Sequence, residues 1–356
     1  MRFYAAHHLS DTGDLGSCRP TRSIERTPPC NGEGHTHLWP SVHFGGRLSL
    51  RGGKPPTGTR KLLGRTLLGM LRSQTMKNFD LGRPFRWNLT RGDRIGSLVG
   101  EFTDPVTDDE ESLRAHERYQ HCLSYTDELV ECAAQVLARS ADSDLYFVGR
   151  SPDSIFDLLS GVLYDTPDLD RLHRLPLSLY GMESTRVTTE DRARLRGHLT
   201  AHGLTPKSLA SRSRKVALCD LVASGSTCEN LYHELRDWIE EQRAPWNIIR
   251  TRIRFLGITP QGHTSPKTWR WHQHADWVRD LPPRAVRNVS LDRGVWRHLA
   301  VGCEPKTADS FHHKRWNDPG AAAPRHDREA RLALAVAVGM SSTDGPGTHA
   351  PRPIVS

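Results

Sequence analysis

The sequence lacks any long apolar stretch and has few hydrophobic residues. Its longest nearly apolar run, Leu332–Met340, is far shorter than the roughly 20 residues of a transmembrane helix. His7 and His8 lie where a secretory signal has its apolar core. Only 36% of the residues are hydrophobic, which indicates that part of the chain cannot bury enough apolar surface to fold. We therefore expect a cytoplasmic protein with no membrane association and with disordered ends.

Lysine is also scarce, and the cysteines form no recognisable pairs. The 356 residues include 8 lysines against 41 arginines, a skew that codon usage in a GC-rich genome produces without selection for phosphate binding. The net charge of +8 is therefore weak support for a nucleic-acid partner. Seven cysteines, an odd number with no CxxC spacing, favour reduced thiols over a disulfide framework or a zinc site. We predict no protein-held metal site.

Composition divides the chain into three parts. Residues 1–75 are rich in Gly, Pro, Arg and Ser without a sustained period, which predicts disorder or a leader upstream of a true start at Met70 or Met76. Residues 305–356 predict a disordered tail, apart from an Ala-rich piece at Asp327–Met340. Between them, residues 76–304 predict an α/β domain whose core spans about 115–300.

Alternating strands and helices support that fold class. Thr107 and Glu110 have the spacing of a capping box and predict a helix that runs to about Arg139. The other expected elements are short strands at Leu145–Val148, Leu175–Tyr180, Lys215–Cys219 and Ile248–Thr259, and helices that begin near Ser151, Thr189 and Thr227. This order predicts a mostly parallel sheet with covering helices.

The strongest functional pattern is the segment Val216–Thr227. It reads as an apolar strand, an acid at the carboxyl end of that strand, a turn of small residues and then a helix. The ends of parallel strands open at a crevice, and the N–H groups at a helix start bind phosphate. Gly225 would let the backbone approach a ligand closely, while the hydroxyls of Ser224, Ser226 and Thr227 would donate to phosphate oxygens. Asp220 would accept hydrogen bonds from the hydroxyls of a sugar.

The segment resembles the phosphoribosyl-pyrophosphate motif of the type I phosphoribosyltransferases. In that family a buried strand ends in two adjacent acids, followed by a spacer and a Thr/Ser-Gly-Ser/Thr loop. Asp220 matches the second acid, Cys219 replaces the first, and Ala223 stands where some members carry a further acid. The resemblance implies that Asp220 holds the ribose hydroxyls and that residues 223–227 surround the 5′-phosphate. The missing acid affects turnover more than ligand binding.

A second match lies about 70 residues upstream, and together the two cover roughly residues 115–300. The run Tyr146–Ser151 resembles the pyrophosphate loop of the same family. The resemblance implies that Gly149, Arg150 and Ser151 bind pyrophosphate, with Arg150 and Asp220 in the catalytic roles. It also implies that Mg²⁺ neutralises the departing pyrophosphate while a nitrogen base attacks C1 of the ribose.

Other interpretations stay open. The chain could be a non-catalytic regulatory domain that binds a phosphorylated sugar or a nucleotide, which suits the absence of an acid at position 219. It could also bind nucleic acid through the Trp- and Arg-rich segment Thr264–Trp277, although tryptophans that seal the edge of a core are the favoured interpretation there. More simply, Asp220 could mark only a sharp strand-to-helix turn, and Arg150 a surface arginine. Arg250, Arg252 and Arg254 alternate like one face of a strand.

Overall fold

The computed structural model describes residues 95–106, 109–163, 166–179, 187–262, 271–301, 304–316, 325 and 327–341. The predicted leader at 1–75, both candidate start methionines and Thr107 lie outside these residues. Among the described residues, no helix is both long enough and apolar enough to cross a membrane.

Five parallel strands form the centre of the fold. They are β1 (Ser143–Val148), β2 (Leu172–Leu175), β3 (Lys215–Leu221), β4 (Ile253–Pro260) and β5 (Val286–Leu291), in the spatial order β2-β1-β3-β4-β5. Every neighbouring pair is parallel. Strands β1, β3 and β4 are apolar on both faces, as is typical of a sheet covered on both sides. The predicted α/β class with a parallel sheet is confirmed.

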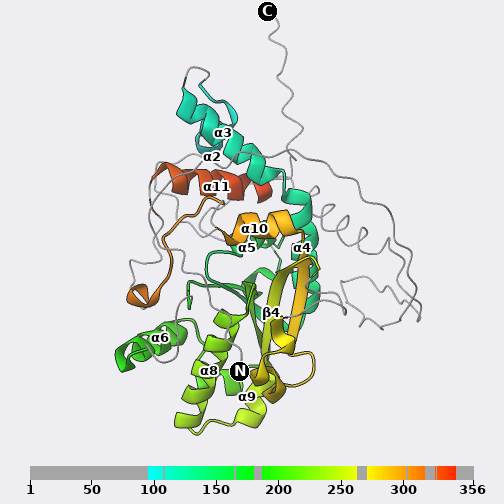
Figure 1. Ribbon diagram of the computed structural model, residues 1–356, viewed down its shortest axis with the longest axis vertical. Helices are drawn as coiled ribbons and strands as arrows, with labels where there is room; N and C mark the ends of the chain where they lie inside the picture. Colours follow the sequence, from blue (N-terminus) through cyan, green and yellow to red (C-terminus); the bar gives the residue numbers. More distant parts are fainter. Residues whose placement is uncertain are drawn as a thin grey trace, which may run out of the picture. The chain divides into compact units, whose positions relative to one another are not determined.

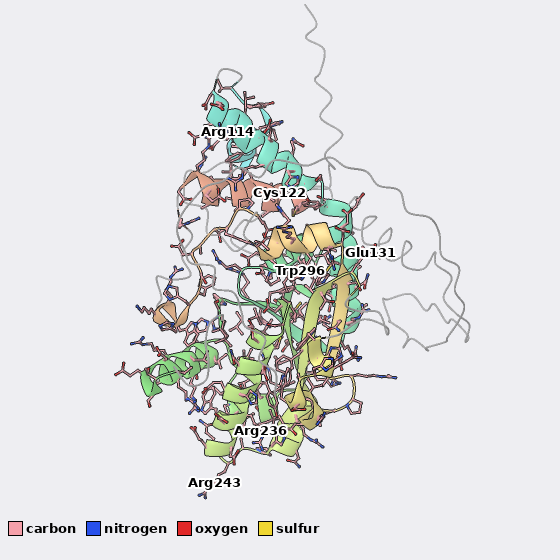
Figure 2. The ribbon with its side chains drawn as sticks, in the orientation of Figure 1. Arg114, Cys122, Glu131, Arg236, Arg243 and Trp296 are labelled. Atoms are coloured by element: carbon pink, nitrogen blue, oxygen red, sulfur yellow. The ribbon has the colours of Figure 1, made fainter. Side chains whose placement is uncertain are left out.

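Helices cover both faces of the sheet. One apolar cluster joins the sheet to α2 (Ile95–Thr103), α3 (Glu110–Leu123), α4 (Thr126–Arg139), α5 (Asp153–Val162), α10 (Arg293–Ala300) and α11 (Arg328–Ser341). A second cluster joins the other face to α6 (Thr189–Ala201), α7 (Pro206–Ser211), α8 (Ser226–Glu241) and α9 (Trp246–Arg252). On α10, Trp296 lies beside the sheet and donates from Nε1 to the carbonyl of Ile258 at 3.0 Å (Figure 2).

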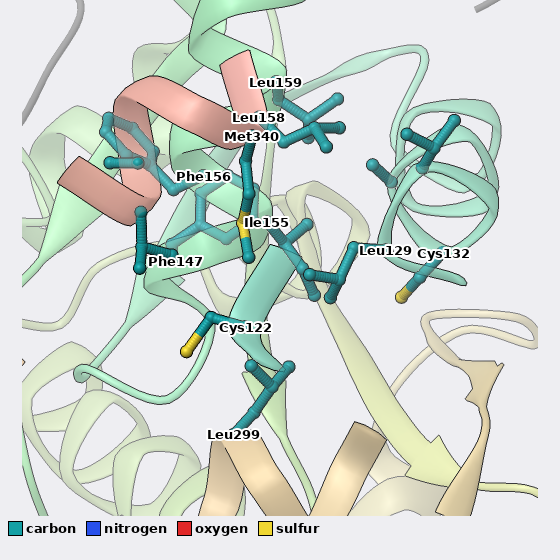
Figure 3. Packing of buried hydrophobic residues seen from close by; sticks show 14 of the residues in the cluster. Cys122, Leu129, Cys132, Phe147, Ile155, Phe156, Leu158, Leu159, Leu299 and Met340 are labelled. Atoms are coloured by element: carbon teal, nitrogen blue, oxygen red, sulfur yellow. The ribbon is translucent and has the colours of Figure 1, made fainter. Parts of the chain in front are cut away.

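The Ala-rich piece excepted from the predicted tail is helix α11, whereas the prediction of disorder was wrong for residues 305–316. Helix α11 lies along α2 and α3 and contacts α5 (Figure 1). Its residues are buried on nearly every side, and Met340 packs near Ile155 and Leu158 of α5 (Figure 3). Such a helix shows no amphipathic period, because it has no solvent face. Residues 304–316 are also described and largely buried.

Three local predictions were wrong in detail. The long helix expected up to Arg139 breaks at Ser124 and Tyr125 into α3 and α4, and Asp109 caps α3 by accepting from the N–H of Glu111. The segment expected as one strand from Ile248 is helix α9 up to Arg252, because the chain leaves Pro245 in a helical turn. Of Arg250, Arg252 and Arg254, only Arg254 therefore lies in a strand. The possible strand at Leu175–Tyr180 lies earlier, as β2.

Candidate functional site

Strands β1 and β3 are neighbours in the sheet, although β2 comes between them in the chain. Phe147 of β1 pairs with Cys219 of β3, so the segments that follow these strands begin side by side. The chain leaves β1 through α5 on one face of the sheet and returns to β3 through α6 and α7 on the other face. This is a topological switch point, where open parallel sheets bind ligands beyond the carboxyl ends of their strands. The structure thus places the two predicted loops next to each other, at the carboxyl ends of β1 and β3.

We call residues 222–227 the β3 loop. Gly225 is the N-cap of α8 in a left-handed conformation with φ of 91°, and no side chain caps the helix. Ala223, Ser224 and Ser226 are exposed and Thr227 is half-buried. The hydroxyl of Ser224 accepts from the backbone N–H of Ser226 at 3.4 Å. The start of α8 therefore combines oriented N–H groups, of which that of Ser226 already contacts the Ser224 hydroxyl, with serine hydroxyls and the positive end of a 16-residue helix dipole.

Gly225 has a structural role that the sequence did not indicate. A Cβ on Gly225 would overlap Cε3 of Trp271 and lie 2.7 Å from its Cζ3. The same indole lies 3.0 Å, through Nε1, from the position of a Cβ on Gly257. Trp271 is 3% exposed and begins the short helix η3 (Trp271–Gln273). The glycine therefore makes room for a core tryptophan on one side of the loop.

Asp220 does not face open solvent. It lies near the end of β3, opposite Gly257 of β4, and the residue is partly buried. Burial raises the pKa of its carboxyl to about 8, against a smaller lowering by the backbone N–H of Leu221. At neutral pH this carboxyl is mostly protonated, so it can both donate and accept a hydrogen bond.

Cys219 lies on the opposite face of β3 and is completely buried in the core. Burial raises the pKa of its thiol well above the ordinary value, so the side chain is an apolar filler and not a substitute acid. Among the described residues, no group of three or more His, Cys, Asp and Glu side chains could hold a metal ion.

We call residues 149–152 the β1 loop. Gly149 has φ of 77°, its N–H donates to the carbonyl of Leu175 at 2.9 Å, and a Cβ there would lie 3.2 Å from the carbonyl oxygen of Leu177. A glycine is needed at this position, as predicted. Ser151 is half-buried, but Pro152 and not Ser151 is the N-cap of α5. The carbonyl of Arg150 accepts from the N–H of Asp153 at 3.2 Å, so Ser151 lies inside a turn that precedes the helix.

Arg150 is not a surface arginine. Its Nη1 donates to the carbonyl of Ala308 at 2.7 Å, and its own carbonyl accepts from Nζ of Lys306 at 3.1 Å. Burial lowers the pKa of its guanidinium, while Asp153 and Asp309 raise it and Arg325 and Arg315 lower it. Three of these four charged groups, Asp309, Arg315 and Arg325, belong to the far end of the chain.

Sequence reasoning missed the segment that covers the β1 loop. Glu304 is 3% exposed, accepts from the hydroxyl of Ser154 on α5 and pairs with Lys306. Further along, the N–H of Ser178, just beyond β2, donates to the carbonyl of Phe311 at 2.9 Å. Residues 304–311 have no hydrophobic period, so only these long-range contacts reveal their place.

Comparison with known proteins adds no assignment. No protein-family model matches the chain, and neither the curated proteins nor the solved structures gave a match. We therefore infer the function from the geometry and chemistry of the chain alone.

Proposed function

We propose that the chain binds phosphoribosyl pyrophosphate, or a related phosphorylated sugar or nucleotide, at the carboxyl edge of β1 and β3. The observation that carries this proposal is the pairing of β1 with β3, which brings the β1 and β3 loops to one switch point. The two loops are those that resemble the pyrophosphate and phosphoribosyl motifs of the type I phosphoribosyltransferases. We propose binding of this ligand first, and transfer of its phosphoribosyl group to a nitrogen base second.

Each loop supplies a different part of the recognition. The start of α8 and the hydroxyls of Ser224 and Ser226 suit a 5′-phosphate, because a helix N-terminus offers both oriented N–H donors and a partial positive charge. Asp220 suits the ribose hydroxyls, to which it can donate and from which it can accept. Arg150 supplies a guanidinium for the diphosphate group of the ligand, which would arrive as its magnesium complex.

The single acid favours a second candidate, a non-catalytic domain that senses such a ligand. Transfer through a cation-like sugar needs negative charge near C1, and electrostatic stabilisation of that kind is usually a large part of catalysis. Asp220 is mostly neutral at pH 7 and Cys219 is buried on the other face. This pair of observations supports binding more strongly than turnover.

The nucleic-acid alternative has less support. Trp271 and Trp277 of the Trp- and Arg-rich segment are both buried, at 3% and 5% exposure, and Trp269 lies outside the described residues. On α8, Arg236 covers the ring of Trp246, with 4.8 Å from its guanidinium carbon to the ring centre. Trp271 and Trp277 pack inside the protein, so neither ring is open for stacking on a base.

Calorimetry with phosphoribosyl pyrophosphate and Mg²⁺ tests the proposal. We expect Asp220→Ala to weaken binding by roughly two- to tenfold, because a hydrogen bond between neutral groups is worth about 0.5–1.5 kcal/mol. Asp276→Ala is the matched control, since Asp276 is an exposed acid in an ion pair with Arg279. Release of pyrophosphate in the presence of a nitrogen base separates transfer from binding. Equal affinities for the Asp220 variant, the control variant and the unmodified chain would remove Asp220 from the site.

A further inference from the structure

Three arginines from distant parts of the chain meet at one short segment beside the β1 loop. Arg325 donates through Nη2 to the carbonyl of Lys306 at 3.1 Å, and Arg150 donates through Nη1 to that of Ala308 at 2.7 Å. Arg315 donates through Nη1 to the carbonyl of Ser310 at 3.1 Å. These carbonyls belong to five consecutive residues, which span at most about 14 Å. The guanidinium groups are therefore gathered around one stretch of backbone.

The charges around this segment differ in how firmly they are paired. Lys306 and Glu304 form a buried pair, and so do Arg174 and Asp153 at 3.3 Å. Arg325 pairs instead with acids at the surface, Asp309 at 2.9 Å and Asp327 at 3.2 Å, whose side chains are 66% and 48% exposed.

Exposed ion pairs are weak and can exchange partners with a ligand. The three guanidinium groups also act on one another, since Arg315 and Arg325 both lower the pKa of Arg150. An anion placed among them would relieve that repulsion.

We infer that a diphosphate group binds among Arg150, Arg315 and Arg325, so that residues 304–316 together with Arg325 complete the ligand site. The identity of the ligand rests on the proposed function. Guanidinium groups suit this ligand, because each offers planar paired donors to phosphate oxygens and keeps its charge. Lys306 holds the β1 loop in place through the carbonyl of Arg150. The segment predicted as a tail thereby becomes part of the site.

Calorimetry on the full chain with inorganic pyrophosphate and, separately, with ribose 5-phosphate tests this inference. We expect Arg315→Ala and Arg325→Ala each to weaken pyrophosphate binding by roughly tenfold and to leave ribose 5-phosphate binding unchanged. Arg194→Ala is the control, because Arg194 pairs only at longer range with Glu190 and Asp191 on α6. Arg315→Lys and Arg325→Lys keep the charge and guard against loss of folding, and we expect an intermediate affinity from each. Affinity should also fall with added salt.

The outcomes separate the two proposals. If the Arg315 and Arg325 variants bind pyrophosphate like the unmodified chain, while Asp220→Ala weakens ribose 5-phosphate binding, the inference is overturned and the proposed function stands. If those variants weaken pyrophosphate binding but ribose 5-phosphate never binds, the arginine site stands and the proposed function fails. Absence of binding by either ligand overturns both.

Discussion

The β1 and β3 loops lie side by side, yet they are held in different ways. Polar contacts fix the β1 loop, through Gly149 to Leu175, Arg150 to Ala308 and Lys306 to Arg150. The β3 loop is fixed on one side by the indole of Trp271 against Gly225, while Ser224 and Ser226 stay exposed. The β1 loop depends on hydrogen bonds from residues that lie 156 and 158 positions away in the sequence. The β3 loop depends on the close fit between Gly225 and the indole of Trp271.

The comparison teaches what a loop motif leaves open. Both motifs specify a strand, a turn with a left-handed glycine and a helix, and both turns have that form. Neither motif says what covers the turn. The residues that cover a turn decide whether it is enclosed in the core or exposed, so that a ligand can reach it.

Breaking the polar support of the β1 loop should have the largest effect. Glu304→Ala leaves Lys306 and the hydroxyl of Ser154 without their buried acceptor. Removing one partner of a buried ion pair costs about 3–5 kcal/mol, because the other charge stays buried and unpaired. We expect urea denaturation to show a loss of that size in the free energy of unfolding.

Glu110→Ala is the control for this change, since Glu110 and Arg114 form an exposed pair on α3 that should contribute less than about 1 kcal/mol. If the two variants lost the same free energy of unfolding, residues 304–306 would not support the β1 loop.

A substitution at Gly225 tests the shape-based support of the β3 loop and should have the next largest effect. Gly225→Ala combines strain at a φ of 91° with overlap between the new Cβ and Trp271. Left-handed strain of about 1–2 kcal/mol and overpacking of about 1–3 kcal/mol predict a total loss of roughly 2–5 kcal/mol.

Gly203→Ala separates these two causes. Gly203 has φ of 70° and nothing within 4 Å of its Cβ position, so only the strain applies there. Thermal unfolding of both variants should place Gly225→Ala well below Gly203→Ala. Similar melting temperatures for the two would mean that Trp271 does not press on the loop.

The sequence predicted the parallel α/β fold, because the alternation of strands and helices follows from local period. At Gly225 it predicted close approach to a ligand, whereas the close neighbour in the structure is Trp271. The distance between residues 225 and 271 in the sequence hides that contact.

The largest failure, the prediction of a disordered tail at residues 305–316, has a physical cause. Residues 304–310 are held by backbone carbonyls that accept from arginines, and every residue has a carbonyl, so side-chain identity carries no signal there. The arginines themselves were indistinguishable from the many others in the chain.

The smallest expected effect concerns the edge between the two loops, where Asp220 lies. Its pKa of about 8 in the folded chain is above the ordinary value near 4, so between these pH values the unfolded state binds fewer protons than the folded state. Stability should therefore fall as the pH rises from about 4 to 8 and level off above that.

Asp220→Asn, which cannot ionise, should lose this part of the slope. Because the residue is partly exposed, we expect a difference on the order of 1–2 kcal/mol in urea denaturation at pH 5 and pH 8. Parallel pH profiles for the variant and the unmodified chain would show that the carboxyl is solvated, and Asp220 would then resemble the exposed serines of the β3 loop more than the enclosed Arg150.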